Sequence, residues 1–281
     1  DGRYQMDFDD LTAIARDPQT KMLILCSPHN PLGRVWSRDE LTRLAEICRA
    51  NDVLVVSDEI HGDLTFVPFV SYGTLGDEFT QNAVITTAAS KTFNLAGLSN
   101  SNIIIPNAGL RKQFETYLLK NAFFGTNLFG RLATETAYTH GADWLDQLLE
   151  YLSGTLNFME AYFAKHIPQV RMIRPEGTYL VWLDCRALGL DATSLHRFFL
   201  DRVHSVVSDR ACPAIAKADS HGVRTVIIPE GDKWKFSDLV LEYLKAQGAD
   251  YVISFYSKLF VGELLNEYRD RIINLHPSLL P

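Results

Sequence analysis

Several features that assign a sequence quickly to a functional class are missing from this chain of 281 residues. No apolar run approaches the ~20 residues that a membrane-spanning helix needs, and the opening residues Asp-Gly-Arg-Tyr do not resemble a signal peptide. The four cysteines are far apart and form no C-x-x-C pair: Cys26, Cys48, Cys185 and Cys212. This spacing argues against a zinc site or a disulfide framework, and it is typical of proteins of the reducing cytoplasm, where we expect this one.

Clusters of positive charge are also missing. The formal net charge is −7, and the Lys and Arg residues are scattered along the chain, whereas nucleic-acid-binding proteins concentrate them in a patch. No G-x-G-x-x-G follows a predicted strand, so a nicotinamide-binding Rossmann domain is not indicated. We therefore expect neither a nucleic acid nor a membrane as a partner, and the hydrophobic content of 47% is that of an ordinary globular protein.

The sequence does contain a series of short apolar segments bounded by turn residues. They are too short for helices and apolar on both faces, which is typical of buried parallel strands. The first four span residues 22–27, 53–59, 83–88 and 102–106. Between the first two, Ser37 and Glu40 form a capping box at the start of a helix predicted over 37–51. A strand, a helix and a strand in this order form a βαβ unit, so we predict an α/β fold.

The remainder of the chain continues this alternation. Helical spacing dominates from about 110 to 165, with breaks at 125–130 and 140–141, and strands at 170–174 and 179–184 follow, joined by a turn at Pro175-Glu-Gly177. A short helix is predicted near 193–200. A second βα series then starts without a linker. Its predicted strands are 203–208, 225–229, 251–255 and 272–275, and its helices lie near 213–220, 236–247 and 257–268.

Polar residues follow three of the first four predicted strands. The first strand leads to Asn30, the second to Asp58 and His61, and the third to Ser90 and Lys91. Each residue alone has a common structural explanation, such as a turn carboxylate, a hydrogen-bonded histidine or a surface lysine. Because ligands bind beyond the carboxyl ends of an open parallel sheet, their convergence on successive strand ends favours a binding site.

These side chains are the set that pyridoxal phosphate (PLP) chemistry needs. A lysine must form a Schiff base with the cofactor and later move a Cα proton, and a carboxylate must keep the pyridine nitrogen protonated. A neutral donor such as Asn30 can bind the phenolic oxygen, and Ser90 and Thr87 are candidates to reach the phosphate.

Three strings carry a resemblance to a known family. Ser27-Pro-His-Asn-Pro-Leu-Gly33, Ser57-Asp-Glu-Ile-His61 and Ser90-Lys-Thr-Phe-Asn-Leu-Ala-Gly97 resemble, in order and spacing, the fold-type I aminotransferase superfamily of PLP enzymes. His61 after Asp-Glu-Ile, together with Gly177-Thr-Tyr-Leu-Val-Trp-Leu-Asp184, is similar to the cystathionine β-lyase-like C–S lyases. The resemblance covers about residues 1–200.

This resemblance implies a role for each candidate residue. Lys91 would be the catalytic lysine that holds PLP, Asp58 would pair with the pyridine nitrogen, and Asn30 would bind the phenolic oxygen, with His61 and Ser90 also in the cofactor site. The Asn30–Pro31 bond is expected to be cis. The implied reaction is β-elimination on a cysteine S-conjugate or cystathionine, which yields a thiol, pyruvate and ammonia. An aminotransferase would share all these residues and remains an alternative.

Two further expectations follow from the resemblance. The family forms homodimers with the active site at the interface, so a homodimer acting on an amino acid is expected here. The family pattern also has a long preceding segment, with a phosphate-binding loop and a stacking aromatic, and a later arginine for the substrate carboxylate. This sequence shows no counterpart of them, and we therefore expect an incomplete site and impaired activity.

The last part of the chain resembles a different family. Val203-His-Ser-Val-Val-Ser-Asp-Arg210, Gly222-Val-Arg-Thr-Val226 and Arg271-Ile-Ile-Asn-Leu-His-Pro-Ser-Leu-Leu-Pro281 are similar to the formyltransferases typified by phosphoribosylglycinamide formyltransferase. The resemblance implies that Asn274 and His276 polarise the formyl group of a folate donor. Because the glycine-rich loop and the catalytic Asp of that family have no counterpart here, we expect no formyl transfer. A formyltransferase-like segment and a non-catalytic chimera are the remaining alternatives.

The predicted fold class is therefore α/β. It consists of a partial fold-type I PLP-enzyme large domain, a mostly parallel sheet with helices on both faces, followed by a partial Rossmann-like formyltransferase segment. The predicted parts are the large domain at 1–166, the start of a small domain at 167–201 and the formyltransferase-like segment at 202–281.

Overall fold

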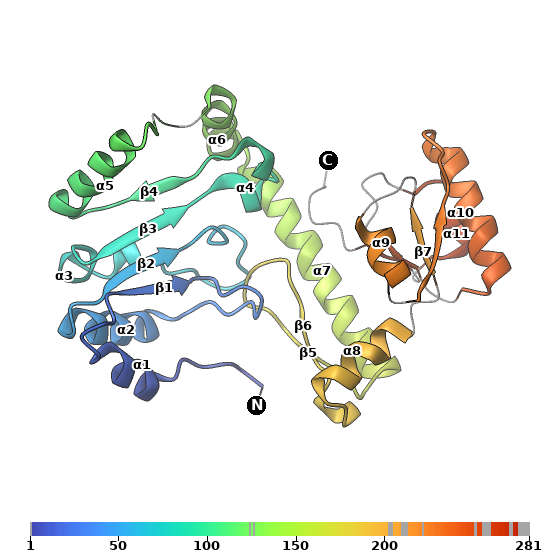
Figure 1. Ribbon diagram of the computed structural model, residues 1–281, viewed down its shortest axis with the longest axis horizontal. Coiled ribbons are helices and arrows are strands. Elements are labelled where there is room, and N and C mark those ends of the chain that lie inside the picture. The colour runs from blue at the N-terminus through green and yellow to red at the C-terminus, as the bar shows by residue number, and fades with distance from the viewer. Residues whose placement is uncertain are drawn as a thin grey trace. The chain divides into compact units, whose positions relative to one another are not determined.

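The computed structural model divides the chain into two compact units, residues 1–188 and 189–281 (Figure 1). The residues it describes are 2–123, 125, 127–201, 205–208, 213–220, 222–249, 252–254, 260–269 and 272–274. No helix within these ranges is long and apolar enough to cross a membrane.

The first unit is built on a four-stranded sheet in the order β1-β2-β3-β4. The strands are β1 Met22–Cys26, β2 Leu54–Asp58, β3 Ala83–Thr87 and β4 Asn102–Ile104. The first three are parallel, as predicted, but β4 runs antiparallel to β3. The prediction of a parallel fourth strand is wrong because its connection holds only the one-turn helix α4 (Ala89–Thr92) and a 3₁₀ turn (Ala96–Leu98). A parallel strand needs a crossover that returns to the other end of the sheet.

Helix α2 (Arg38–Ala50) supplies the core of this unit, with α1 (Phe8–Ala15) packed beside it. The predicted capping box is present, since the Ser37 side chain accepts from the backbone N–H of Glu40 and the Glu40 carboxylate accepts from that of Ser37. The apolar face of α2 buries Leu41, Leu44, Ala45 and Cys48, which join Val55 of β2 in one hydrophobic cluster. The prediction that β1 is buried on both faces is wrong. Leu25 is buried, whereas Ile24 on the opposite face is 74% exposed.

Three helices and a hairpin complete the first unit. The helical region divides into α5 (Ala108–Lys120), α6 (Leu128–His140) and α7 (Ala142–His166), which confirms both predicted breaks. The strands β5 (Arg171–Ile173) and β6 (Trp182–Asp184) pair antiparallel. The remaining short elements are α3 (Asp77–Thr80) and the 3₁₀ turns Tyr72–Thr74 and Arg186–Leu188.

The second unit confirms the predicted second βα series. After α8 (Ala192–Asp201), β7 (Ser205–Ser208) pairs parallel with β8 (Arg224–Ile227), and β9 (Val252–Ser254) pairs parallel with β10 (Ile272–Asn274). The helices are α9 (Pro213–Ser220), α10 (Lys233–Gln247) and α11 (Glu263–Glu267). A small core joins α10 to α11 through residues that include Phe236, Val240, Leu244, Leu264 and Tyr268.

Candidate functional site

The carboxyl ends of β1, β2 and β3 lie next to one another. Cys26 pairs with Asp58, and Asp58 pairs with Thr86, so the three strands end in register. The register continues into the loops, where the backbone N–H of Ser27 donates to the carbonyl of Asp58 over 2.9 Å. The residues that follow these strands are therefore brought to one edge of the sheet, as predicted (Figure 1).

Asn30 lies in a tight loop after β1. The backbone N–H groups of His29 and Gly33 donate to the carbonyls of Arg34 and His29 over 2.7 Å each, which closes the loop on itself. The Asn30–Pro31 bond is cis, which confirms the prediction. The backbone N–H of Asn30 donates to the Cys26 thiol over 3.3 Å.

A buried arginine fixes this loop to the rest of the unit. The guanidinium of Arg34 forms ion pairs with Glu176 and with Glu40, the latter at 2.7 Å, and its Nε donates to the carbonyl of Tyr4 over 2.8 Å. Gly33 has φ +69°, and a Cβ there would lie 2.9 Å from the carbonyl oxygen of Gly177. The loop that carries Asn30 is thus packed closely on the turn between β5 and β6.

Asp58, the last residue of β2, and Glu59 after it both accept hydrogen bonds from the backbone of nearby residues. The Asp58 carboxylate accepts from the backbone N–H of Ile60, and the buried Glu59 accepts from Tyr72 N and from the Ser57 hydroxyl. Burial raises the pKa of Glu59, and Asp58 adds to this effect, against the hydrogen bonds that lower it. Glu59 therefore anchors the 71–72 turn, whereas Asp58 remains half-buried at the sheet edge.

His61 is the most enclosed member of the site, with 2% of its surface exposed. Its Nε2 lies 3.5 Å from the amide nitrogen of Asn30, and its ring meets that of Tyr179 edge-on, with centroids 5.9 Å apart. Burial lowers the pKa of His61, the positive charge of Lys91 lowers it further, and Asp58 opposes both. His61 is therefore neutral at neutral pH. With the amide of Asn30 donating to Nε2, the proton sits on Nδ1, which has no partner among the described residues.

Lys91 lies in α4, directly after β3, and is half-buried, as is Ser90 before it. Lys91 lowers and Asp58 raises the pKa of His61, so both charged groups lie near its imidazole. Thr87, at the end of β3, accepts a hydrogen bond from the Asn102 side chain over 3.2 Å. The structure therefore brings Asn30, Asp58, His61 and Lys91 together, as the sequence predicted.

Three neighbours of this group were not predicted as site residues: Cys26, Asp63 and Tyr179. Burial raises the pKa of the Cys26 thiol, and the nearby Asp58 carboxylate acts in the same direction, so the thiol is protonated at neutral pH. Tyr179 follows Thr178, a buried residue with φ +69°. Tyr179 lies within a string that we had identified only as a family motif, and Asp63 lies two residues after His61.

The structure describes one of the two residues predicted from the second resemblance. Asn274 is the last residue of β10. His276 lies outside the described residues.

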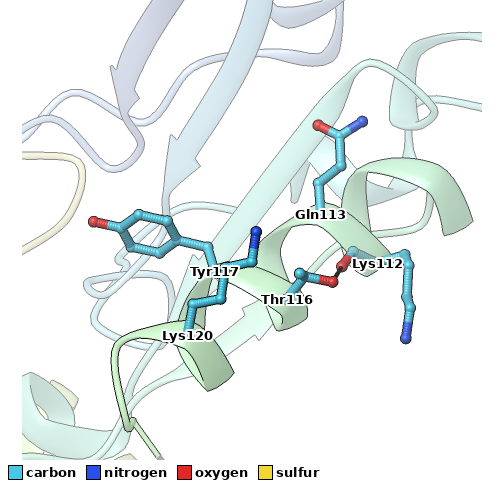
Figure 2. Close-up of a pocket in the computed structure, with 5 residues that line it drawn as sticks. All are labelled: Lys112, Gln113, Thr116, Tyr117 and Lys120. Carbon is cyan, nitrogen blue, oxygen red and sulfur yellow. Dashed lines mark hydrogen bonds between the residues drawn. The ribbon is translucent and has the colours of Figure 1, made fainter.

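A surface hollow of about 370 Å³ lies on α5 rather than at the sheet edge. Figure 2 shows that its lining side chains all come from that one helix: Lys112, Gln113, Thr116, Tyr117 and Lys120. None of the predicted site residues borders it, and we assign it no function.

Comparison with known proteins agrees with the geometry of the first unit. The model of the aminotransferase class I and II family matches residues 1–233. The chain belongs to this family. A second model, that of the formyl transferases, matches residues 198–281, in agreement with the second resemblance.

Within the aminotransferase class I and II family, the similar proteins include several C–S lyases. The chain is 44% identical over 207 residues to the cystathionine beta-lyase PatB of Bacillus subtilis, which covers 72% of this chain and 53% of that protein. It is similar to the crystal structure of cystalysin from Treponema denticola, which contains PLP, with a TM-score of 0.68 and 34% identity. It is also similar to the PLP-bound C–S lyase of Staphylococcus hominis, with a TM-score of 0.65 and 35% identity.

Each of these two structures covers 72% of this chain, and the chain covers 52% of each. The chain thus spans about half the length of the relatives it matches. Aspartate aminotransferases are also among the relatives, with 28% identity for that of Geobacillus stearothermophilus over 60% of this chain and 43% of that protein.

Proposed function

We propose that this chain contains the cofactor-binding part of a PLP-dependent C–S lyase that catalyses β-elimination on a cysteine S-conjugate or cystathionine. The observation that carries the proposal is the convergence of Lys91, Asp58 and Asn30 on the edge where β1, β2 and β3 end in register. The similarity to C–S lyases favours this reaction over transamination, which is the second candidate.

The residues at this edge fit the functional groups of PLP. The amine of Lys91 suits the aldehyde, the carboxylate of Asp58 suits the pyridine nitrogen, and the amide of Asn30 suits the phenolic oxygen. The buried Nδ1 of His61, which has no partner among the described residues, is a further polar atom at the site. Ser90 and Thr87 contribute hydroxyl groups for the phosphate.

When bound, PLP supplies an electron sink that makes the Cα proton of an amino acid acidic. In the proposed reaction, the free amine of Lys91 would take up that proton, and the Cβ–S bond of the substrate would break with its electron pair leaving on sulfur. The proton held by Lys91 is then available to the departing thiolate. Asp58 would hold a proton at the pyridine nitrogen, and the amide of Asn30, which lies 3.5 Å from Nε2 of His61, would donate its other hydrogen to the phenolic oxygen.

We propose further that the protein is a homodimer, as the family resemblance implies, and that the two family segments join near residue 201. The overlap of the two family models at 198–233 supports a junction in this region. The mass of the purified chain in sedimentation equilibrium tests the first statement.

The products distinguish the two candidate reactions. With PLP and L-cystathionine, a C–S lyase releases a thiol and pyruvate in equal amounts without a second substrate, and Lys91→Ala abolishes both. An aminotransferase instead forms an amino acid from 2-oxoglutarate and releases no thiol. A chain that binds PLP and produces glutamate but no thiol would contradict the lyase assignment.

A further inference from the structure

Asp63 joins two segments that bear on the site but are distant in sequence. Its carboxylate Oδ2 accepts a hydrogen bond from the hydroxyl of Thr92 over 3.0 Å and another from the phenol of Tyr138 over 3.3 Å. Thr92 is buried and follows Lys91 directly in the one-turn helix α4. Asp63 itself lies two residues after His61, in the loop that follows β2. The carboxylate therefore links the loop of His61 to the helix of Lys91.

The Tyr138 contact is part of a longer seam between α6 and the segment that carries Lys91. At the start of α6, the Asn127 side chain donates to the carbonyl of Leu98 over 2.6 Å. One turn later Gly130 approaches the same carbonyl, and a further turn along, the Thr134 hydroxyl accepts from the side chain of Asn100 over 2.7 Å. These positions follow one another at helical spacing, so a single face of α6 contacts residues 98–100.

The same face continues to the end of α6. The Phe93 ring meets Tyr138 edge-on at 5.9 Å and lies 5.7 Å from Trp144. A side chain at Gly141 would collide with the Phe93 ring, whose Cε1 lies 2.5 Å from the position of the added Cβ. The segment after Lys91 is thus held against α6 by packing, and Asp63 is the charged group that ties this packing to the loop after β2.

We propose that Asp63 is a positioning residue that sets the place of Lys91 relative to Asp58 and His61. A four-residue helix has little stability of its own, so α4 depends on its tertiary contacts. The carboxylate of Asp63 satisfies the buried hydroxyl of Thr92, and a hydrogen bond to a charged acceptor is about twice as strong as a neutral one. This inference rests on the proposed role of Lys91, but the first of its two tests does not depend on that role.

The first measurement is hydrogen exchange on the chain without cofactor. The backbone N–H of Phe93 donates to Ala89 and that of Leu95 donates to Ser90, so these two amides report the opening of α4. In Asp63→Ala we expect them to exchange about tenfold faster, because the Thr92 hydroxyl is left buried without its acceptor. Asp63→Asn keeps an acceptor oxygen and should recover most of the protection. Asp77→Asn, an exposed carboxylate on α3, serves as the matched control with no change.

The second measurement is the rate at which PLP is trapped on Lys91 by borohydride. We expect this rate to fall about tenfold in Asp63→Ala and to recover in Asp63→Asn, with circular dichroism unchanged. Thr92→Val should reproduce the loss, and the double variant should be no worse than the more severe single one, because both changes remove the same contact.

The outcomes separate this inference from the proposed function. If the unsubstituted chain traps no PLP on Lys91, the proposed function fails, while the exchange data still show whether Asp63 holds the helix of Lys91 in place. Unchanged exchange at Phe93 and Leu95 in Asp63→Ala overturns the inference. Faster exchange with an unchanged trapping rate, in a chain that does trap PLP, also overturns it, since Asp63 would then stabilise α4 without positioning Lys91.

Discussion

The ion pair between Arg34 and Glu176 allows a quantitative test of how the Asn30 loop is held. The side chains of Arg34 and Glu176 are 5% and 24% exposed. Glu176 also accepts from the backbone N–H of Val35 over 2.9 Å. Removing one partner of a buried pair costs about 3–5 kcal/mol because the other charge stays buried. Since Glu40 remains as a second partner of Arg34, we expect Glu176→Gln to cost about 3 kcal/mol, the lower end of that range.

The chain offers a matched control for this substitution. Arg174 and Glu160 form an ion pair of 2.8 Å with the same chemistry, but their side chains are 41% and 54% exposed. Because water and side-chain entropy reduce the value of an exposed pair, Glu160→Gln should cost less than about 1 kcal/mol. The two substitutions remove the same carboxylate charge and differ in the burial of the arginine partner, although Glu176→Gln also weakens the pair of Glu176 with the exposed Arg3, 2.9 Å away.

The assay is urea unfolding followed by tryptophan fluorescence, because Trp36 lies against the guanidinium of Arg34, 4.7 Å from the ring centroid to Cζ. We expect Glu176→Gln to lower the unfolding midpoint clearly and Glu160→Gln to leave it almost unchanged. In the double variant Arg34→Met/Glu176→Gln, the loss should be about 2 kcal/mol smaller than the sum of the single losses. Equal costs for the two glutamate variants, or strict additivity in the double variant, would refute the reasoning.

Two other predictions concern the backbone and the pH dependence. Gly33→Ala should cost at least about 2 kcal/mol of stability, because φ at Gly33 is +69° and the new Cβ would collide with Pro175. The control Gly154→Ala, in the middle of α7, should instead stabilise the protein by about 1 kcal/mol. Thermal unfolding compares the two variants, and equal shifts of their midpoints would contradict this account of the turn. The pKa of His61 is lowered from its ordinary 6.5, so as the pH falls below this value the unfolded state takes up the proton first and the free energy of unfolding decreases. His61→Gln should lose less stability than the unsubstituted chain between about pH 7.5 and 5.5 in urea unfolding, and identical pH profiles would show that His61 titrates normally.

The local features of the fold were predictable because short-range chemistry determines them. The capping box of Ser37 and Glu40 marked the start of α2, and the apolar runs marked β1 to β3. The direction of β4 was not predictable from its composition, because its direction depends on the path of the connection before it. The exposure of Ile24 was missed for a related reason: an apolar residue indicates a strand but not which of its faces is covered.

The site was predictable as far as strand order determines it. Asn30, Asp58 and Lys91 each follow a strand, and the parallel register brings them together. The contacts of Asp63 with Thr92 and Tyr138 were not predictable, since they join residues 29 and 75 positions apart in the sequence through side-chain packing. The ion pair of Arg34 with Glu176 is another long-range contact of this kind, and it joins residues 142 positions apart.

The most direct test of the PLP site is covalent trapping on the chain as it stands. The purified protein is incubated with PLP, reduced with borohydride, digested and mapped by mass spectrometry, with Lys91→Arg and Asp58→Asn in parallel. If Lys91 is the cofactor lysine, the label appears on Lys91, is absent there in the arginine variant and is weaker in Asp58→Asn. A label spread over exposed lysines such as Lys112 and Lys120, with no preference for Lys91 in a folded protein, would contradict it.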